Sequence, residues 1–122
     1  MAYPSVHKFN SIHKDTYSPS IGGSPAAAYI RIPFRCQIGL VYAVTNGAIT
    51  TADCSVAVAL NGTAIAGSPF LIPVASAGAG EVASMTPTSP VYANADDYLS
   101  FTPSGASGSN ISAMFSAALI SR

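Results

Sequence analysis

Hydrophobic and polar residues alternate along residues 54–67, CSVAVALNGTAIAG, in two runs separated by Asn61-Gly62. A period of two residues is that of a β-strand. Asn-Gly between two alternating runs is the strongest short-range signal for a β-hairpin. One face of the predicted hairpin carries Cys54, Val56, Val58, Leu60, Thr63 and Ile65, and the other carries Ser55, Ala57, Ala59, Ala64 and Ala66. The second set of residues is called the alanine face below.

The same alternation continues through most of the chain after residue 28. In AYIRIPF it places Ile30, Ile32 and Phe34 on one side. In CQIGLVYAVT it gives a common face to Cys36, Ile38, Leu40, Tyr42 and Val44, and in ISAMFSAALI to Ile111, Ala113, Phe115, Ala117 and Leu119. PFLIPV, EVASMTP and YLSFTP predict further short strands, and NGAITTAD predicts a turn. The chain is therefore expected to be all-β, an antiparallel β-sandwich or jelly roll.

Helix is the alternative for the alanine-rich runs, because alanine is the best helix former. Strict alternation and β-branched valines favour a strand in SVAVALNG. The final run SAMFSAALI is also predicted as a strand, and no segment predicts a helix.

Residues 1–28 differ from the rest of the chain. They hold both histidines, three of the ten charged residues, and Pro4, Pro19 and Pro25. Their apolar residues are spaced too widely for a core strand: Tyr3, Val6, Phe9, Ile12, Tyr17 and Ile21. Residues 1–28 are therefore predicted to form an extended N-terminal arm, and residues 29–122 to form the sandwich domain. Such an arm is either disordered or orders on a partner, and the regular spacing of its apolar residues favours a partner.

Charged residues are few, which bears on the partners of the chain. They make up 8% of its 122 residues, against roughly 25% in ordinary globular domains. The formal net charge is zero, and Asp53 is the one charged residue between positions 36 and 80. Low charge favours association, because self-repulsion keeps small proteins apart. No basic patch suggests a nucleic-acid partner.

A membrane partner is not predicted either. The most apolar regions, IGLVYAV and SPFLIPVASAGAG, are short or interrupted by Pro69 and Pro73, whereas a membrane-spanning helix needs about 20 apolar residues. The N-terminal stretch lacks the apolar core of a signal peptide. The chain is therefore expected to be made and folded in a cytoplasm.

The chain offers few candidates for catalysis or metal binding. Asp96-Asp97, with Asn94 before them, suits either a calcium site or a tight turn, and the small number of ligands favours the turn. No Gly-x-Ser-x-Gly motif occurs, and both histidines, His7 and His13, lie in the predicted arm. A Cys-His-Asp arrangement with Asp53 and Cys54 would need one of these histidines to fold back. Glu81 and Asp97 form only an arbitrary carboxylate pair. No enzymatic activity, metal or cofactor is expected.

Two further features leave alternatives open. In a reducing compartment, Cys36 and Cys54 are expected to be two buried free thiols, and a disulfide between neighbouring strands is the alternative. Sugar-binding sandwich modules use exposed aromatic residues, but this chain has no tryptophan. Its tyrosines also fall in no single loop, since Tyr29, Tyr42 and Tyr98 lie within strand patterns and Tyr92 lies just before a turn.

The alanine face raises the question of what covers it. A second sheet of the same sandwich would cover only one face of each sheet, and large exposed apolar surfaces are rare on monomers. Copies of the chain, or a larger assembly, are therefore predicted to cover the alanine face.

The run IPFRCQIGLVYAVTNGAITTADCSVAVALNGTAIAG, followed by VYANADDYLSF and ISAMFSAALI, resembles the small β-sandwich proteins of tailed bacteriophage heads known as decoration or cement proteins. The shared features are an extended N-terminal arm, a strand before the polar turn NGAITTAD, the LNGT hairpin and a late Asp-aromatic turn. The resemblance spans about residues 30–120. DDYLSF and the final strand are also similar to trimeric jelly rolls of the tumour-necrosis-factor type, although Ala95 or Asp96 stands where those proteins have glycine.

The resemblance implies a structural virion protein on the outer capsid surface. It implies homotrimers that bind the major capsid protein, bridge neighbouring subunits and stabilise the shell. The arm is the candidate clamp, with Tyr3, Pro4, Phe9, Ile12 and Tyr17 as partner-binding residues. Deletion of residues 1–27 is expected to leave a folded core that no longer binds capsids.

Two other functions fit the same sequence. One is a receptor- or glycan-binding module of a phage tail or head fibre, with its specificity in exposed loops. The other is a minor capsid or neck component present in few copies.

Overall fold

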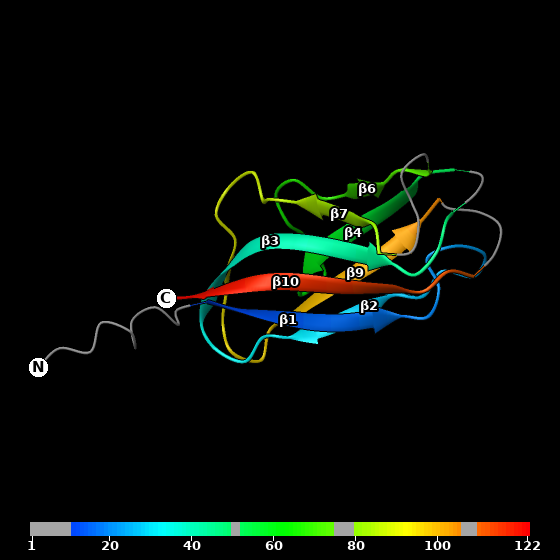
Figure 1. Ribbon diagram of the computed structural model, residues 1–122. Coiled ribbons are helices and arrows are strands. Elements are labelled where there is room, and N and C mark those ends of the chain that lie inside the picture. Colours follow the sequence, from blue (N-terminus) through cyan, green and yellow to red (C-terminus); the bar gives the residue numbers. More distant parts are fainter. Residues whose placement is uncertain (1–10, 50–51, 75–79, 106–109) are drawn as a thin grey trace, which may run out of the picture.

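The chain forms two antiparallel five-stranded sheets. The sheets pack face to face, as Figure 1 shows. The computed structural model describes residues 11–49, 52–74, 80–105 and 110–122, and none of these residues lies in an α-helix. Sheet A has the order β1-β10-β3-β7, with β8 also paired to β3; sheet B has the order β2-β9-β4-β5, with β6 also paired to β4. The predicted all-β antiparallel sandwich is confirmed.

The strands of sheet A are β1 (Ser11–Ser18), β3 (Cys36–Thr45), β7 (Val82–Met85), β8 (Tyr92–Ala93) and β10 (Ala113–Ser121). Those of sheet B are β2 (Ala28–Arg31), β4 (Cys54–Leu60), β5 (Thr63–Ala64), β6 (Phe70–Ile72) and β9 (Tyr98–Ser104).

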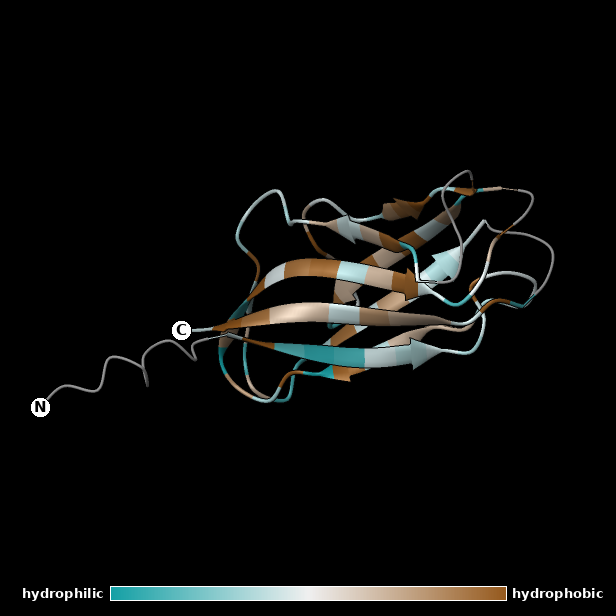
Figure 2. Ribbon diagram, viewed as in Figure 1, coloured by the Kyte–Doolittle hydropathy of each residue, from teal (hydrophilic) through white to brown (hydrophobic). Residues whose placement is uncertain are grey.

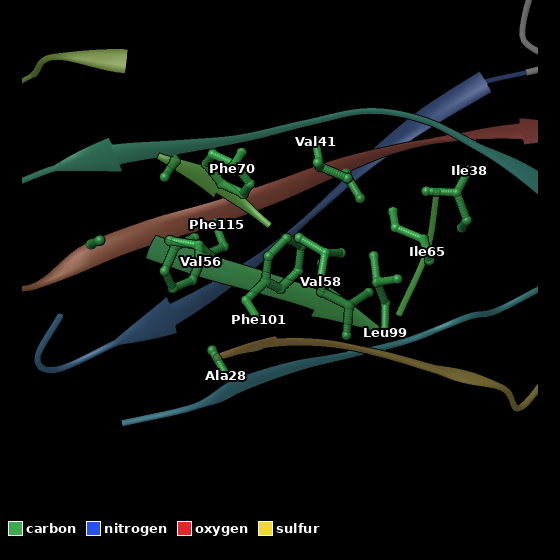
Figure 3. Close-up of a cluster of buried hydrophobic side chains, with 14 of the residues drawn as sticks. Ala28, Ile38, Val41, Val56, Val58, Ile65, Phe70, Leu99, Phe101 and Phe115 are labelled. Carbon is green, nitrogen blue, oxygen red and sulfur yellow. The ribbon is translucent and has the colours of Figure 1, made fainter. Parts of the chain in front are cut away.

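The core lies between the two sheets and consists of alternate residues from their inner strands. Phe101 of β9 and Phe115 of β10 are fully buried and stack in parallel across the interface, with ring centroids 5.0 Å apart. Aliphatic side chains from both sheets surround this pair, among them Val56, Val58 and Leu99 (Figure 3). Removal of these apolar groups from water is the main force that holds the sheets together.

The predicted hairpin at Asn61-Gly62 is confirmed. Both turn residues have positive φ, 51° and 87°, as the tight turn between β4 and β5 requires. Cys54, Val56 and Val58 face the core as expected, but Thr63 is exposed. It belongs to a strand of two residues, β5, at the edge of the sheet, where the opposite sheet no longer covers it.

Strand β3 departs from the predicted pattern after Ile38. The prediction placed Leu40, Tyr42 and Val44 on the buried face, whereas Val41, Ala43 and Thr45 are buried instead. The cause is a β-bulge: Ile38 pairs with Leu119 and Val41 with Ala117, so Gly39 and Leu40 together face Ala118. One extra residue on a strand moves every later side chain to the opposite face.

A side chain at Gly39 would be crowded at this bulge. A Cβ atom on Gly39 would lie 3.2 Å from Cδ1 of Ile120 and 3.4 Å from Cβ of Ala118. The bulge turns Leu40 and Val44 outward, so that apolar side chains reach the outer face of sheet A.

The N-terminal region also differs from the predicted arm over residues 1–28. Residues 11–18 form β1, which pairs with β10 along its whole length, and Ile21 is fully buried. Residues 11–28 therefore lie in the sandwich, and residues 1–10 lie outside the described residues. The wide spacing of the apolar residues did not indicate this strand, because β1 is held at the edge of the sheet by backbone pairing with β10. Figure 2 shows that its side chains are mostly hydrophilic, as is common for edge strands.

Candidate functional site

A row of apolar side chains crosses the outer face of sheet A. Tyr17 of β1 pairs with Met114 of β10, Met114 with Val44 of β3, and Val44 with Val82 of β7. Residues that pair directly across strands share one face of a sheet. Tyr17, Met114 and Val82 are 57%, 42% and 62% exposed, and Val44 is half-buried. These four residues are called the apolar row below.

A hollow of about 440 Å³ opens beside the apolar row. Its lining consists of Tyr17, Val44 and Met114 from the row, together with Thr45, Asn46, Gly80, Ser112 and Ala113. An interacting side chain can enter here and contact apolar groups on three strands.

The neighbouring cross-strand row on this face is polar. It runs through Asp15, Ser116, Tyr42 and Ser84. The Ser116 hydroxyl donates a hydrogen bond to Oδ1 of Asp15, and the His13 ring meets Tyr42 edge-on with centroids 6.1 Å apart. The apolar row therefore has a polar boundary, as is usual for an interaction surface.

The predicted clamp residues lie in different places. Tyr3, Pro4 and Phe9 lie outside the described residues. Ile12 pairs with the core residue Leu119 and so faces the inner side of sheet A, whereas Tyr17 points outward beside Met114. Five residues along a strand span about 17 Å. The structure therefore does not bring Ile12 and Tyr17 together.

The alanine face lies on the outer side of sheet B. Ala57 and Ala64 are exposed and Ala59 is half-buried, while sheet A covers only the opposite, inner face of β4. Across β9, the paired residues on this outer side are Ser100, Thr102 and Ser104. Small methyl groups on β4 thus lie beside hydroxyl groups on β9. That copies of the chain cover this face stays a prediction.

Two tyrosines at one end of this face form a pair that sequence reasoning missed. Tyr29 of β2 and Tyr98 of β9 are 60% and 44% exposed. Their rings meet edge-to-face, with centroids 6.2 Å apart and planes at 62°. Each ring points outward because its neighbour in the strand points into the core: Ile30 follows Tyr29, and Leu99 follows Tyr98. Their proximity depends on the pairing of β2 with β9, which no local pattern indicates.

The Asp96-Asp97 segment is the tight turn that the sequence favoured over a calcium site. The backbone N–H of Asn94 donates to Oδ2 of Asp97 at 2.8 Å, and Asp96 has a positive φ of 72°. Asp96 also pairs with Arg31 of β2. Among the described residues, no group of three histidine, cysteine or acidic side chains is placed to hold a metal ion.

Hydrogen bonds to the Asp97 carboxylate hold its pKa below the usual range. The Asn94 backbone N–H contributes most, and the Asn61 side chain adds to the effect. A lowered pKa in the folded state means that the ionised carboxylate stabilises the turn. This contribution is present above the unfolded-state pKa of about 3.9 and is lost as the pH falls through the folded-state value.

We therefore expect Asp97→Asn to reduce the pH dependence of stability in acid. At pH 7 the variant should unfold at a lower temperature than the wild type, because the asparagine lacks the charged acceptor. The two melting temperatures should converge as the pH falls through the folded-state pKa of Asp97. Thermal unfolding monitored by circular dichroism between pH 2 and pH 7 measures this difference. A constant gap over that range would contradict the assignment.

Both cysteines are free and buried, as predicted, with no disulfide between them. Burial raises the pKa of the Cys36 thiol, and the nearby Asp97 charge raises it further. Burial also raises the pKa of Cys54, although a hydrogen bond with the Ser104 backbone opposes the shift. Thiols with raised pKa values are poor nucleophiles.

The hypothetical Cys-His-Asp arrangement does not form within the described residues. The Asp53 carboxylate accepts a hydrogen bond from the Val74 backbone, and His13 contacts Tyr42 on the outer face of sheet A. His7 lies outside the described residues. The lack of enzymatic activity stays a prediction. Across the described ranges, no helix is long and apolar enough to cross a membrane.

Comparisons with known proteins show similarity in fold and none in sequence family. No family model and no curated protein matches the chain. A chain in the acidic stable capsid structure of Helicobacter pylori bacteriophage KHP30 is 14% identical, with a TM-score of 0.49, over 89% of this chain and 93% of that chain. The Podospora anserina GH26-CBM35 β-(1,4)-mannanase is 12% identical, with a TM-score of 0.50, over 91% of this chain and 27% of that chain.

A third similar structure is the catalytic unit of a GH87 α-1,3-glucanase from Streptomyces thermodiastaticus. It is 10% identical, with a TM-score of 0.48, over 93% of this chain and 26% of that chain. The chain thus spans about a quarter of the length of either hydrolase. At identities this low, the comparisons show a similarity of fold alone, and a fold does not determine function.

Proposed function

We propose that this chain is a capsid decoration, or cement, protein that binds the outer surface of a virion shell and bridges neighbouring major capsid subunits. The observation that carries the proposal is the apolar row of Tyr17, Met114, Val44 and Val82 on the outer face of sheet A, in which all but Val44 are exposed. Apolar side chains gathered on the surface of a small protein mark an interaction site. The bacteriophage decoration proteins that the sequence resembles supply the proposed partner.

The low charge of the chain supports a permanent structural contact. Charged groups are costly to bury at an interface unless they are paired. None of the four residues of the apolar row is charged, and the nearby Asp15 carboxylate accepts a hydrogen bond from Ser116. The row can therefore be covered by a capsid subunit at a small electrostatic cost. We also propose that the chain is made in the host cytoplasm and forms homotrimers on the shell.

Residues 1–10 remain the candidate clamp, with Tyr3, Pro4 and Phe9 as its anchors. The structure changes how this part of the proposal is tested. Deletion of residues 1–27 would remove β1 and the buried Ile21, and would damage the sandwich itself. Deletion of residues 1–10 leaves every described strand in place.

The test is co-sedimentation of the purified chain with shells that lack it. The wild type is expected to bind to saturation, and the chain without residues 1–10 is expected to bind about tenfold more weakly. Circular dichroism and the melting temperature of the truncated chain serve as its folding control. No binding by the wild type would contradict the proposed function. Unchanged binding by the truncated chain would contradict only the clamp.

A further inference from the structure

The Tyr29–Tyr98 pair forms an open aromatic corner on the outer face of sheet B. The two rings are exposed, and their planes are inclined at 62° to each other. Arg31 pairs directly with Tyr98 across β2 and β9, and Tyr29 lies two residues from Arg31 on the same face of β2. Two aromatic rings, a guanidinium and the carboxylate of Asp96 thus meet at one place.

Tyr98 is held firmly by the hairpin turn beside it. The Asn61 backbone N–H donates to the Tyr98 carbonyl oxygen at 2.9 Å, and the Tyr98 N–H donates to Oδ1 of Asn61 at 3.0 Å. The turn before Tyr98 is joined to β2, because the Ile32 N–H donates to the Asp97 carbonyl at 2.8 Å. A backbone fixed on both sides lowers the entropy lost when a ligand is bound.

The Arg31–Asp96 ion pair lies beside the two rings. Its side chains are 68% and 74% exposed, and so exposed a pair contributes little to stability. The guanidinium still offers a planar fork of N–H donors, and the carboxylate offers two acceptor oxygens. The charges of Arg31 and Asp96 cancel, and the exposed carboxylate of Asp97 next to Tyr98 leaves the turn with one net negative charge.

The alanine face provides an open floor next to the corner. From Tyr29 the cross-strand row continues through Ser100 and Ala59 to Ala64. The Ser100 hydroxyl is turned into the sheet, where it donates to the Ala59 carbonyl at 3.4 Å. Because these side chains are small, a ligand longer than one sugar ring can extend across β9 and β4 without a steric clash.

We infer that the corner of Tyr29 and Tyr98, flanked by Arg31 and Asp96, binds a neutral oligosaccharide. The C–H groups on one face of a pyranose ring carry partial positive charge and pack on the negative face of an aromatic ring. Paired hydroxyl groups on the sugar match the forked donors of arginine and the acceptors of aspartate. The net negative charge of the turn disfavours phosphorylated or acidic sugars and so selects neutral ones.

A sugar bound here would compete with the predicted cover of the alanine face by copies of the chain, and a protein partner fits the corner itself less well. A protein interface is built around a core of large apolar side chains. The outer-facing residues of β4 and β9 next to the tyrosines are alanine, serine and threonine. This inference goes beyond the proposed function, because the corner and the apolar row lie on the outer faces of different sheets.

The test is titration of the ¹⁵N-labelled full chain with cellohexaose, β-1,4-mannohexaose and lacto-N-tetraose, followed by NMR. At least one of these neutral probes is expected to shift the amide signals of Tyr29, Arg31 and Tyr98. Tyr98→Ala is expected to weaken that binding by about tenfold or more, because a stacking face is lost. Tyr98→Phe is expected to keep it within about twofold, because the ring remains.

Tyr17→Ala is the matched control, since Tyr17 is as exposed as Tyr29 but lies on sheet A. This variant should bind the sugar as the wild type does. No shift with any of the three probes would overturn the inference, as would shifts confined to other residues or an equal loss in Tyr17→Ala. Shell binding is measured separately, so failure here leaves the proposed function intact. Conversely, a chain that binds sugar but no shell would contradict only the proposed function.

Discussion

Met114→Lys is expected to lower the affinity of the chain for shells at least about a hundredfold while leaving the sandwich folded. Met114 lies between Tyr17 and Val44 in the apolar row, and its side chain is 42% exposed in the free protein. A lysine there reaches solvent before binding. Once a capsid subunit covers the row, its ammonium group is buried without a partner, and this costs several kcal/mol.

The measurement is co-sedimentation with shells over a range of protein concentrations. Leu71→Lys is the matched control, because Leu71 is 54% exposed but lies on the outer side of sheet B. It should bind shells like the wild type. If Leu71→Lys loses binding and Met114→Lys does not, the contact lies on sheet B and the assignment to the apolar row is wrong.

Phe101→Ala is expected to lower the free energy of unfolding by about 3–5 kcal/mol. The Phe101 ring is fully buried and stacks on Phe115 across the two sheets, with planes only 1° apart. Its removal leaves a cavity that neighbours on two sheets cannot fill without moving. Domains of this size are stable by about 5–15 kcal/mol, so the variant retains a small margin or unfolds.

Urea unfolding followed by circular dichroism measures this loss. Leu71→Ala serves as the comparison, because truncation of an exposed side chain should change the free energy of unfolding by no more than about 0.5 kcal/mol. Similar losses in the two variants would show that the stacked pair is not the centre of the core. A Phe101→Ala chain that is already unfolded in the absence of urea agrees with the expectation.

The parts of the fold that the sequence predicted are those with an uninterrupted period of two residues. Cys54, Val56 and Val58 in β4, and Phe115 and Leu119 in β10, are buried as expected. In these strands the alternation of side chains directly reports which face meets the opposite sheet. The Asn61-Gly62 turn was equally readable, because its positive φ angles demand such residues.

The errors arose where long-range pairing overrides the local pattern. The bulge at Gly39 and Leu40 shifts the phase of β3, and nothing in CQIGLVYAVT marks its position except one glycine. Strand β1 belongs to sheet A because its backbone pairs with β10, although its residues resemble those of a loop. The hydrophobic pattern is a weak signal for an edge strand that is held mainly by backbone hydrogen bonds.

The candidate sites depend on these same long-range features. The apolar row needs the bulge, which turns Val44 outward, and it needs β1, which supplies Tyr17. The aromatic corner needs the pairing of β2 with β9 to bring Tyr29 to Tyr98. Both surfaces combine residues far apart in the sequence, so only the topology shows them.

The number of copies of this chain in purified particles, relative to the major shell protein, tests the decoration role most directly. Quantitative mass spectrometry of particles purified from the source of the chain gives this ratio. A lattice-wide decoration protein is expected to approach the abundance of the shell protein. A count of only a few copies per particle, or absence from particles, would contradict that role.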